Sequence, residues 1–431
     1  MPMSDDAATR ARAHLAAAQN KLQRLIDVDP YFIDLSLREN PFGSRMGQTL
    51  EDKLAILPLV REFGFTNILF GTLDYSYPSW LEVDDDFMMY LRDHDIDRSG
   101  GFAFTDVGYA VSQHVFDPSP SMLKLQSYGV PNTLHEIYLS KDGMNIPLPR
   151  LLRDLPRSIA WLHEHIVGDG GGPPRIIINI VDGCDAFADN FDAVCEVLTM
   201  LAQQPIEGVS FEDDRGTFLP FQVGAYVAAA RELLPPPRKL LVHMHSGGGF
   251  ENASVLEALA NGADGVWGAL PKRAAIIGHA SLGELIANLV RVGNGNMKRY
   301  QLAQLLPLAT RLQYTDDVEA LPEDLPILGK NAYRITLDFF RQKAGRFMDL
   351  PADAIGGTLG YRVCPLAADP TVLRGRLVEV TGWSPSAFGD GTMLEMIRLM
   401  RLDLREKKRI VYDEPAQLMD LYHRAGGQDG K

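Results

Sequence analysis

The feature that most constrains the fold is a regular alternation of short β-rich runs with amphipathic stretches. Amphipathic segments such as 49–64, 190–204 and 221–234 separate most of the β-rich runs. Those runs lie at residues 31–37, 66–73, 100–107, 134–140, 175–181, 208–212, 239–245 and 264–270. Alternating strands and helices are typical of parallel βαβ units, and eight strands about 35 residues apart predict a closed barrel. The expected fold class is therefore α/β, a (β/α)8 TIM barrel followed by a smaller, mostly helical C-terminal domain.

The segments that flank the barrel have different patterns. Residues 1–28 are Ala-rich and predict an N-terminal helical extension, and the barrel is expected over 29–310. The stretch 311–330 is polar and contains prolines, as a linker would be. Residues 331–431 are expected to form the C-terminal domain, with helical segments at its start (331–347) and near its end (393–410).

The overall charge and the few cysteines limit the class of protein. There are 42 basic and 56 acidic residues, which leave a formal net charge of −14 and argue against a nucleic-acid partner. No apolar run reaches the roughly 18 residues of a membrane span, and the N-terminus does not resemble a secretory signal. The three cysteines, Cys184, Cys195 and Cys364, have no paired spacing. We expect a cytoplasmic protein with no membrane partner.

The histidines at the end of run 239–245 are the strongest functional signal. Active sites of such barrels lie at the carboxyl ends of the strands. His243 and His245 are two residues apart, so on a strand both imidazoles point to the same face. Two imidazoles with one carboxylate suit a divalent transition metal, and Glu39, just after the first strand, is the expected carboxylate. The alternative is an accidental pair hydrogen-bonded near a glycine loop.

The chain contains a second pair of histidines with the same spacing. His163 and His165 lie in a helical stretch, where positions i and i+2 diverge by about 200° around the axis. We therefore interpret them as residues of a helix surface and reject them as metal ligands.

Other residues at the rim are candidates for chemistry. Arg38 beside Glu39 can stabilise the oxygen of an enolate, or it can form a structural ion pair. The glycines at 247–249 let backbone approach a ligand closely, although a turn after any strand would use them. Asp182 and Tyr333 are candidate acid–base groups; the alternatives are a loop carboxylate and a packed phenol.

Several segments, taken in order, resemble the DRE-TIM metallolyase superfamily. The segment Asp34-Leu35-Ser36-Leu37-Arg38-Glu39 is similar to its opening D-x-T-L-R-[D/E] strand, and Asp213 to Pro220 is similar to its D-T-x-G-x-x-x-P motif. His243-Met244-His245 matches its paired metal-binding histidines. Residues 326–340 resemble the linker segment of its condensing synthases. The superfamily includes isopropylmalate, homocitrate and Re-type citrate synthases and hydroxymethylglutaryl-CoA (HMG-CoA) lyase.

The resemblance implies roles for individual residues. It implies Arg38 as the catalytic arginine and Glu39, His243 and His245 as ligands of a divalent cation (Zn, Mn or Mg). His279 stands where some members place an asparagine near the metal, so it is either a fourth ligand or a helix cap. The resemblance also implies a homodimer.

The motifs of this chain depart from the superfamily at the substrate site. We expect Asp214, Arg215, Ser246 and Gly247 to bind substrate. Asp214 replaces a threonine that holds the keto-acid carboxylate in the synthases, and it would repel an anion unless protonated or paired with Arg215. The linker histidine of the synthases, expected near residues 338–340, is absent.

Three functions follow as hypotheses. The first is a metal-dependent synthase that condenses an acyl-CoA with a small 2-oxo acid through an enolate. The second is a metal-dependent aldolase or an HMG-CoA-lyase-like enzyme that cleaves such a bond. The third is a non-catalytic metal-binding barrel that binds a partner protein, since one fold supports many functions.

Overall fold

The computed structural model describes residues 5–37, 49–73, 82–110, 115–270, 277–314, 321–337, 350–366, 368–408 and 410–428. The chain divides into two compact units. The first comprises Met1–Gln301 and Leu308–Ala320, and the second comprises Leu302–Pro307 and Leu321–Lys431.

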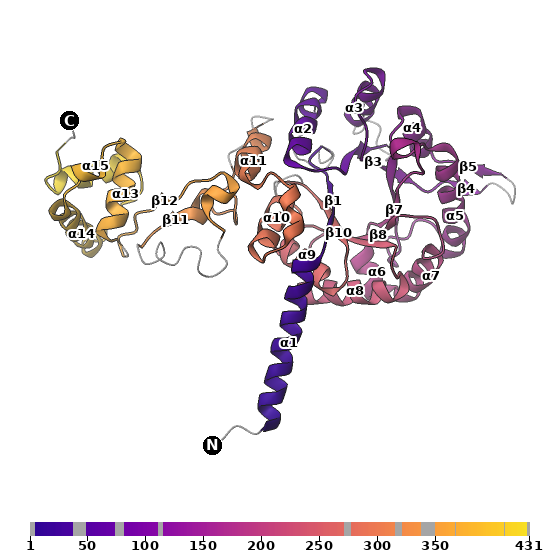
Figure 1. Cartoon of the computed structure of the whole chain (residues 1–431), viewed down its shortest axis with the longest axis horizontal. Coiled ribbons are helices and arrows are strands. Elements are labelled where there is room, and N and C mark those ends of the chain that lie inside the picture. The colour runs from indigo at the N-terminus through magenta and orange to yellow at the C-terminus, as the bar shows by residue number, and fades with distance from the viewer. Residues whose placement is uncertain are drawn as a thin grey trace. The chain divides into compact units, whose positions relative to one another are not determined.

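The first unit is a closed parallel barrel, as the alternation of strands and helices predicts (Figure 1). Its strands follow each other around the barrel in the order β1-β10-β9-β8-β7-β6-β3-β2. Their bounds are β1 Tyr31–Asp34, β2 Ile68–Thr72, β3 Gly101–Asp106, β6 Asn132–Ile137, β7 Ile176–Ile180, β8 Gly208–Asp213, β9 Lys239–Met244 and β10 Gly265–Gly268. Every neighbouring pair is parallel, so the predicted TIM barrel is confirmed.

Helices follow the strands and cover the outside of the barrel (Figure 1). They are α2 Leu50–Phe63, α3 Glu82–Asp93, α4 Pro120–Tyr128, α5 Leu148–His165, α6 Gly183–Asp189, α7 Phe191–Leu201, α8 Pro220–Leu233, α9 Glu251–Asn261 and α10 Leu282–Arg291, followed by α11 Leu305–Tyr314. A small hairpin of β4 Tyr109–Ala110 and β5 Phe116–Asp117 follows β3. Among the described residues, no helix is long and apolar enough to cross a membrane.

The strands are buried on both faces, which explains their nearly continuous apolar sequences. All five residues of β7, Ile-Ile-Ile-Asn-Ile, are buried. Burial on both faces is typical of parallel strands that pack on helices outside and on one another's side chains inside. In the interior, the edge of Phe104 meets Trp267 at a centroid distance of 5.5 Å. The barrel is therefore a packed core, and only its rim offers space for chemistry.

The N-terminal extension is a helix, as predicted, and its C-terminal half is attached to the barrel. This helix, α1 Asp5–Asp27, projects from the barrel in Figure 1. Arg24 Nε donates to the carbonyl of Leu259 in α9 at 2.7 Å, and Lys21 forms an ion pair with Glu257 of the same helix. Residues 9–21 of α1 are exposed.

A buried ion pair joins the carboxyl ends of β1 and β2. The ammonium of Lys53 lies 2.7 Å from Asp84 Oδ1, and both side chains are fully buried. Lys53 also donates to the carbonyls of Leu37 and Phe70, while the N–H of Thr72 donates to Asp84 at 2.8 Å. Because a buried charge needs such partners, the pair holds the backbone at these two strand ends.

The C-terminal unit is mostly helical. It contains α13 Pro370–Thr381, α14 Asp390–Arg405 and α15 Pro415–Arg424, packed around a core that includes Leu377, Met396 and Tyr422. A two-stranded parallel sheet of β11 Arg334–Ile335 and β12 Gly360–Tyr361 accompanies them.

The predicted helix at 331–347 is wrong over its described part, 331–337. There the chain forms a 3-10 helix, Lys330–Tyr333, followed by β11. The carbonyl of Ile335 accepts from the N–H of Arg362, and the Arg334 guanidinium pairs with Asp413 at 2.8 Å. These contacts with distant segments favour extended backbone over the local helical preference.

We predict that His135 makes the folded chain sensitive to acid. Its ring is fully buried on β6, Nδ1 lies 2.8 Å from Thr105 Oγ1, and Nε2 has no hydrogen-bond partner among the described residues. Burial lowers its pKa to about 3. The folded state therefore holds the ring neutral, while the unfolded chain protonates it below about pH 6.5.

The stability contributed by the neutral ring should thus be present above about pH 6.5 and fall as the pH drops toward 3. The free energy of unfolding should decrease by up to about 1.4 kcal/mol per pH unit from this single group. Denaturant titrations at pH 7, 6, 5 and 4 should show a shallower decrease for His135→Gln, which keeps a polar group but cannot titrate. Parallel curves for the two proteins would contradict the prediction.

Candidate metal centre

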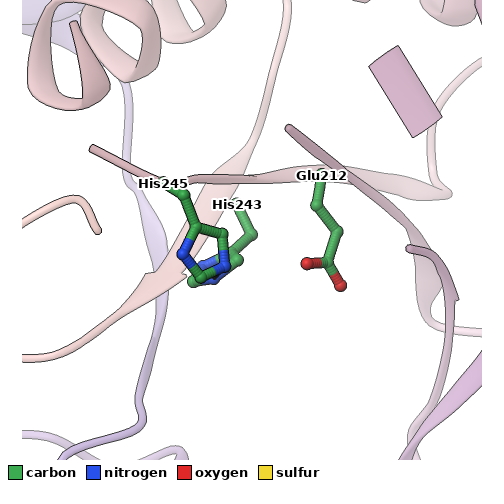
Figure 2. A group of neighbouring side chains, drawn as sticks. All are labelled: Glu212, His243 and His245. Carbon is green, nitrogen blue, oxygen red and sulfur yellow. Dashed lines mark hydrogen bonds between the residues drawn. The ribbon is translucent and has the colours of Figure 1, made fainter. Parts of the chain in front are cut away.

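Neighbouring strands bring three potential metal ligands together at the barrel mouth. Glu212 of β8 lies directly opposite His243 of β9 in the parallel register, and His245 follows two residues later. One ligand atom from each of the three lies within 4.8 Å of the others. Figure 2 shows the three side chains extending to the same side of their strands. The predicted pairing of His243 with His245 on one face is thus observed.

The orientation of His243 suits metal binding. Its Nδ1 lies 2.8 Å from the carbonyl of Trp267, so Nδ1 carries the proton and donates it. The other nitrogen, Nε2, lies 3.2 Å from Nε2 of His245. Two nitrogens that share a metal at about 2.1 Å each are about 3.0 to 3.4 Å apart, depending on the angle between them. The observed spacing falls within that range.

Glu212 is a buried carboxylate held by the strand before it. Asn179 of β7 donates from Nδ2 to Glu212 Oε1, and Glu212 is 5% exposed. A hydrogen bond of this kind orients a ligating carboxylate. Two imidazoles and one carboxylate form a donor set suited to a divalent transition metal, so the residues present fit such an ion.

The expected carboxylate, Glu39, and the expected catalytic arginine, Arg38, lie outside the described residues. Within the described part of the chain, Glu212 is the carboxylate that lies with the two histidines, and the role of Glu39 stays a prediction. Glu212 was not predicted as a metal ligand from the sequence. The signal that could have found it is its position at the end of the sixth barrel strand, because active-site residues lie at strand ends in such barrels.

His279 lies beside the two candidate ligand histidines but outside the three-residue cluster. Its backbone bridges that of His245, and its ring centroid is 5.2 Å from that of His243 and 5.9 Å from that of His245. The ring is fully buried. The cap of α10 is Ser281, whose Oγ accepts from the N–H of Glu284, so the alternative of His279 as a helix cap is wrong.

Asp182 has the contacts of a loop anchor. One carboxylate oxygen accepts from the N–H of Leu139 at 2.8 Å and the other from the N–H of Ser140 at 2.9 Å. Both oxygens therefore hold the backbone that follows β6. This is the structural role of a loop carboxylate, which was the alternative to an acid–base role for Asp182. Tyr333 ends the 3-10 helix of the C-terminal unit, and its catalytic role stays a prediction.

The predicted substrate-binding residues lie on two loops whose backbones pack closely. A Cβ on Gly247 would lie 1.9 Å from the carbonyl oxygen of Arg215, and one on Gly216 would lie 2.1 Å from that of His245. Gly216 has a φ of +65°. Gly247 is thus required for contact between the loops after β8 and β9, which explains it without a ligand.

Asp214 belongs to this loop pair and lies in an acidic environment. Partial removal of its carboxylate from water raises its pKa, and the charges of Asp185 and Asp213 raise it further, while Arg215 opposes them. A raised pKa favours the protonated form of Asp214. Protonation, like pairing with Arg215, would allow Asp214 to lie next to an anionic substrate. The side chains of Asp214 and Arg215 are exposed, and Ser246 is half-buried.

Tyr138 is a residue of the mouth that sequence reasoning missed. It stands two residues after Glu136, just beyond β6. Burial raises the pKa of its phenol, and the negative charges of Glu136 and Glu212 raise it further. The phenol therefore stays protonated, and it can donate a hydrogen bond near the candidate ligands.

The second histidine pair behaves as predicted. His163 and His165 both lie in α5, and their rings turn to separate backbone carbonyls, those of Pro205 and Trp161. They are therefore a natural control for the pair on the strand.

We predict that His243→Ala and Glu212→Gln each weaken binding of Zn²⁺ or Co²⁺ by on the order of 100-fold or more, because each removes a ligand. Elemental analysis of the purified variants and calorimetric titration of the apo protein measure this. His163→Ala should bind as the parent does. Glu39→Gln distinguishes the two carboxylates: full affinity in that variant with loss in Glu212→Gln assigns the ligand to β8, and the opposite result contradicts the assignment.

Comparisons with known proteins agree with the fold. No protein-family model matches the chain, and no curated protein matches it in sequence. Solved structures match in three dimensions. An HMG-CoA lyase from Pseudomonas aeruginosa has a TM-score of 0.54 at 13% identity, covering 69% of this chain and 96% of that one.

Two further solved structures give the same result. An HMG-CoA lyase from Acinetobacter baumannii, in complex with coenzyme A and 3-methylmalate, has a TM-score of 0.53 at 15% identity, covering 69% of this chain and 93% of that one. The lyase from Bacillus subtilis has a TM-score of 0.51 at 16% identity, covering 70% and 97%. The chain therefore has the barrel fold of these HMG-CoA lyases, at low sequence identity.

Proposed function

We propose that this protein is a divalent-metal-dependent enzyme of the DRE-TIM kind, which makes or breaks a carbon–carbon bond through an enolate. The observation that carries the proposal is the convergence of Glu212, His243 and His245 at the carboxyl ends of two adjacent strands. In a TIM barrel this is the place of the active site. The order of motifs and the fold shared with HMG-CoA lyases support it.

The described residues suggest a division of roles. His243, His245 and Glu212 would hold the cation, which when bound polarises a substrate carbonyl and favours the enolate. Tyr138, whose phenol stays protonated near the charges of Glu136 and Glu212, would donate a hydrogen bond to an oxygen of the substrate. Arg38, by resemblance, would stabilise the developing oxyanion. We do not propose Asp182 as the acid–base group, because its carboxylate holds two backbone N–H groups.

Cleavage is the favoured direction of reaction. The three solved structures compared above are lyases, and the linker histidine of the condensing synthases is absent from this chain. Small 2-hydroxy acids or 3-hydroxyacyl thioesters would then be the substrates. The second candidate is acyl-CoA condensation with a 2-oxo acid, which the linker-like segment 326–340 favours. A small-molecule substrate is common to both.

We predict that the metal-loaded protein releases pyruvate, acetyl-CoA or acetoacetate from a panel of hydroxy acids and hydroxyacyl-CoA esters. Coupled assays measure the products, and free-thiol release from acetyl-CoA with 2-oxo acids measures the reverse type of reaction. Glu212→Gln should lower kcat/KM by at least about 100-fold through loss of the cation. Tyr138→Phe should lower kcat by about 10² to 10³-fold with metal content unchanged, because it removes one hydrogen-bond donor.

The outcomes separate the three hypotheses. Cleavage without condensation supports the favoured direction, and thiol release that depends on a 2-oxo acid supports the synthase. Stoichiometric metal with no turnover on either panel would leave the third hypothesis, a metal-binding barrel that binds a partner protein.

A further inference from the structure

Trp267 of β10 makes two separate contacts with the ligand histidine His243. The indole and the imidazole are stacked face to face, with a centroid distance of 3.5 Å and an angle of 4° between their planes. The carbonyl of the same residue accepts the Nδ1 proton of His243 at 2.8 Å. One residue therefore restricts both the plane of the imidazole and the nitrogen that carries its proton.

The indole is itself held from two other sides. Its Nε1 donates to Ser210 Oγ of β8 at 2.8 Å, and the edge of Phe104 from β3 packs against it. Trp267 is 1% exposed. Ser210 precedes Glu212 by two residues on the same strand, so the indole joins β10 to the strand that carries the carboxylate ligand. The side chain is in this way fixed before it contacts His243.

We propose that Trp267 is a positioning residue of the metal centre, which holds the His243 imidazole with Nε2 directed toward His245 and Glu212. The inference rests on the proposed metal function. The stack leaves the imidazole little freedom to rotate about its Cβ–Cγ bond, and the carbonyl selects the tautomer whose Nε2 binds a cation. A ligand that is already oriented loses less conformational freedom when it binds.

The alternative is that Trp267 only fills the core. That role would explain its burial, but replacing Trp267 would then leave the geometry of a bound metal unchanged. The chain offers a matched control. Trp161 of α5 stacks on His165 at 4.3 Å with an angle of 9°, and its carbonyl likewise lies 2.9 Å from that ring's Nδ1. Neither residue belongs to the metal cluster. Trp161→Leu therefore removes a similar stack away from the site.

The experiment measures Co²⁺ binding to the apo protein by calorimetry and by visible absorption, which reports ligand geometry without turnover. Trp267→Leu should weaken the Kd by about 10- to 100-fold and alter the absorption bands, as loss of an orienting partner does. Trp267→Phe keeps an aromatic ring that can stack on His243, so its Kd for Co²⁺ should stay within about 3-fold of the parent value. Trp161→Leu should match the parent in both measurements.

Two further results decide the proposal. If circular dichroism shows that Trp267→Leu does not fold, Ser210→Ala is used to test the proposal. This variant removes the hydrogen bond that anchors the indole and leaves both rings in place. A Kd for Co²⁺ weakened by more than about 3-fold in Ser210→Ala supports a positioning role for Trp267. Parent-like affinity and spectra in a folded Trp267→Leu, or in Ser210→Ala when Leu is not tolerated, would overturn it. A parent protein that binds no Co²⁺ would instead refute the metal centre itself, so the two failures are distinguishable.

Discussion

The parallel register between β8 and β9 is the constraint on which the candidate site depends. It places Glu212 directly opposite His243, and both residues face the interior of the barrel. A slip of one residue would turn one of the two strands' side chains to the helical layer, because side chains alternate between faces. Closure of the barrel fixes this register, since each strand is paired on both sides. The ligand set is therefore a consequence of the fold.

Around the ligands, successive contacts limit the freedom of each group. Asn179 orients Glu212, and Trp267 orients His243 and is held by Ser210. The loops after β8 and β9 can approach only because Gly216 and Gly247 lack a Cβ. The precision of such a site depends on residues that never touch a substrate, because a ligand held by rigid neighbours keeps its geometry. These contacts come from β7, β8, β9 and β10, which are neighbours in the barrel.

The charges at the mouth limit what it can bind. Burial and then the charges of Glu136 and Glu212 raise the pKa of Tyr138, and partial desolvation followed by the charges of Asp185 and Asp213 raises that of Asp214. A cation in the cluster would offset this negative charge and allow an anionic substrate to approach. Within the part of the chain that the structure describes, the carboxylate of the candidate cluster comes from the sixth barrel strand.

Much of the fold and part of the site could be predicted from sequence. The eight strands followed from apolar runs between amphipathic segments, and the shared direction of His243 and His245 followed from the two-residue repeat of a strand. Both are local properties of the chain. The prediction failed at 331–337, where pairing with distant Arg362 and Asp413 outweighs the local preference.

The sequence by itself therefore determined the barrel and the strand that carries the two histidines, because periodicity acts over a few neighbouring residues. Only the tertiary structure decided that Glu212 joins them, that His279 lies beside them, and that Asp182 anchors a loop. These outcomes depend on register between strands and on contacts across tens of residues. No local pattern encodes such distances, because they are set by how the whole barrel closes.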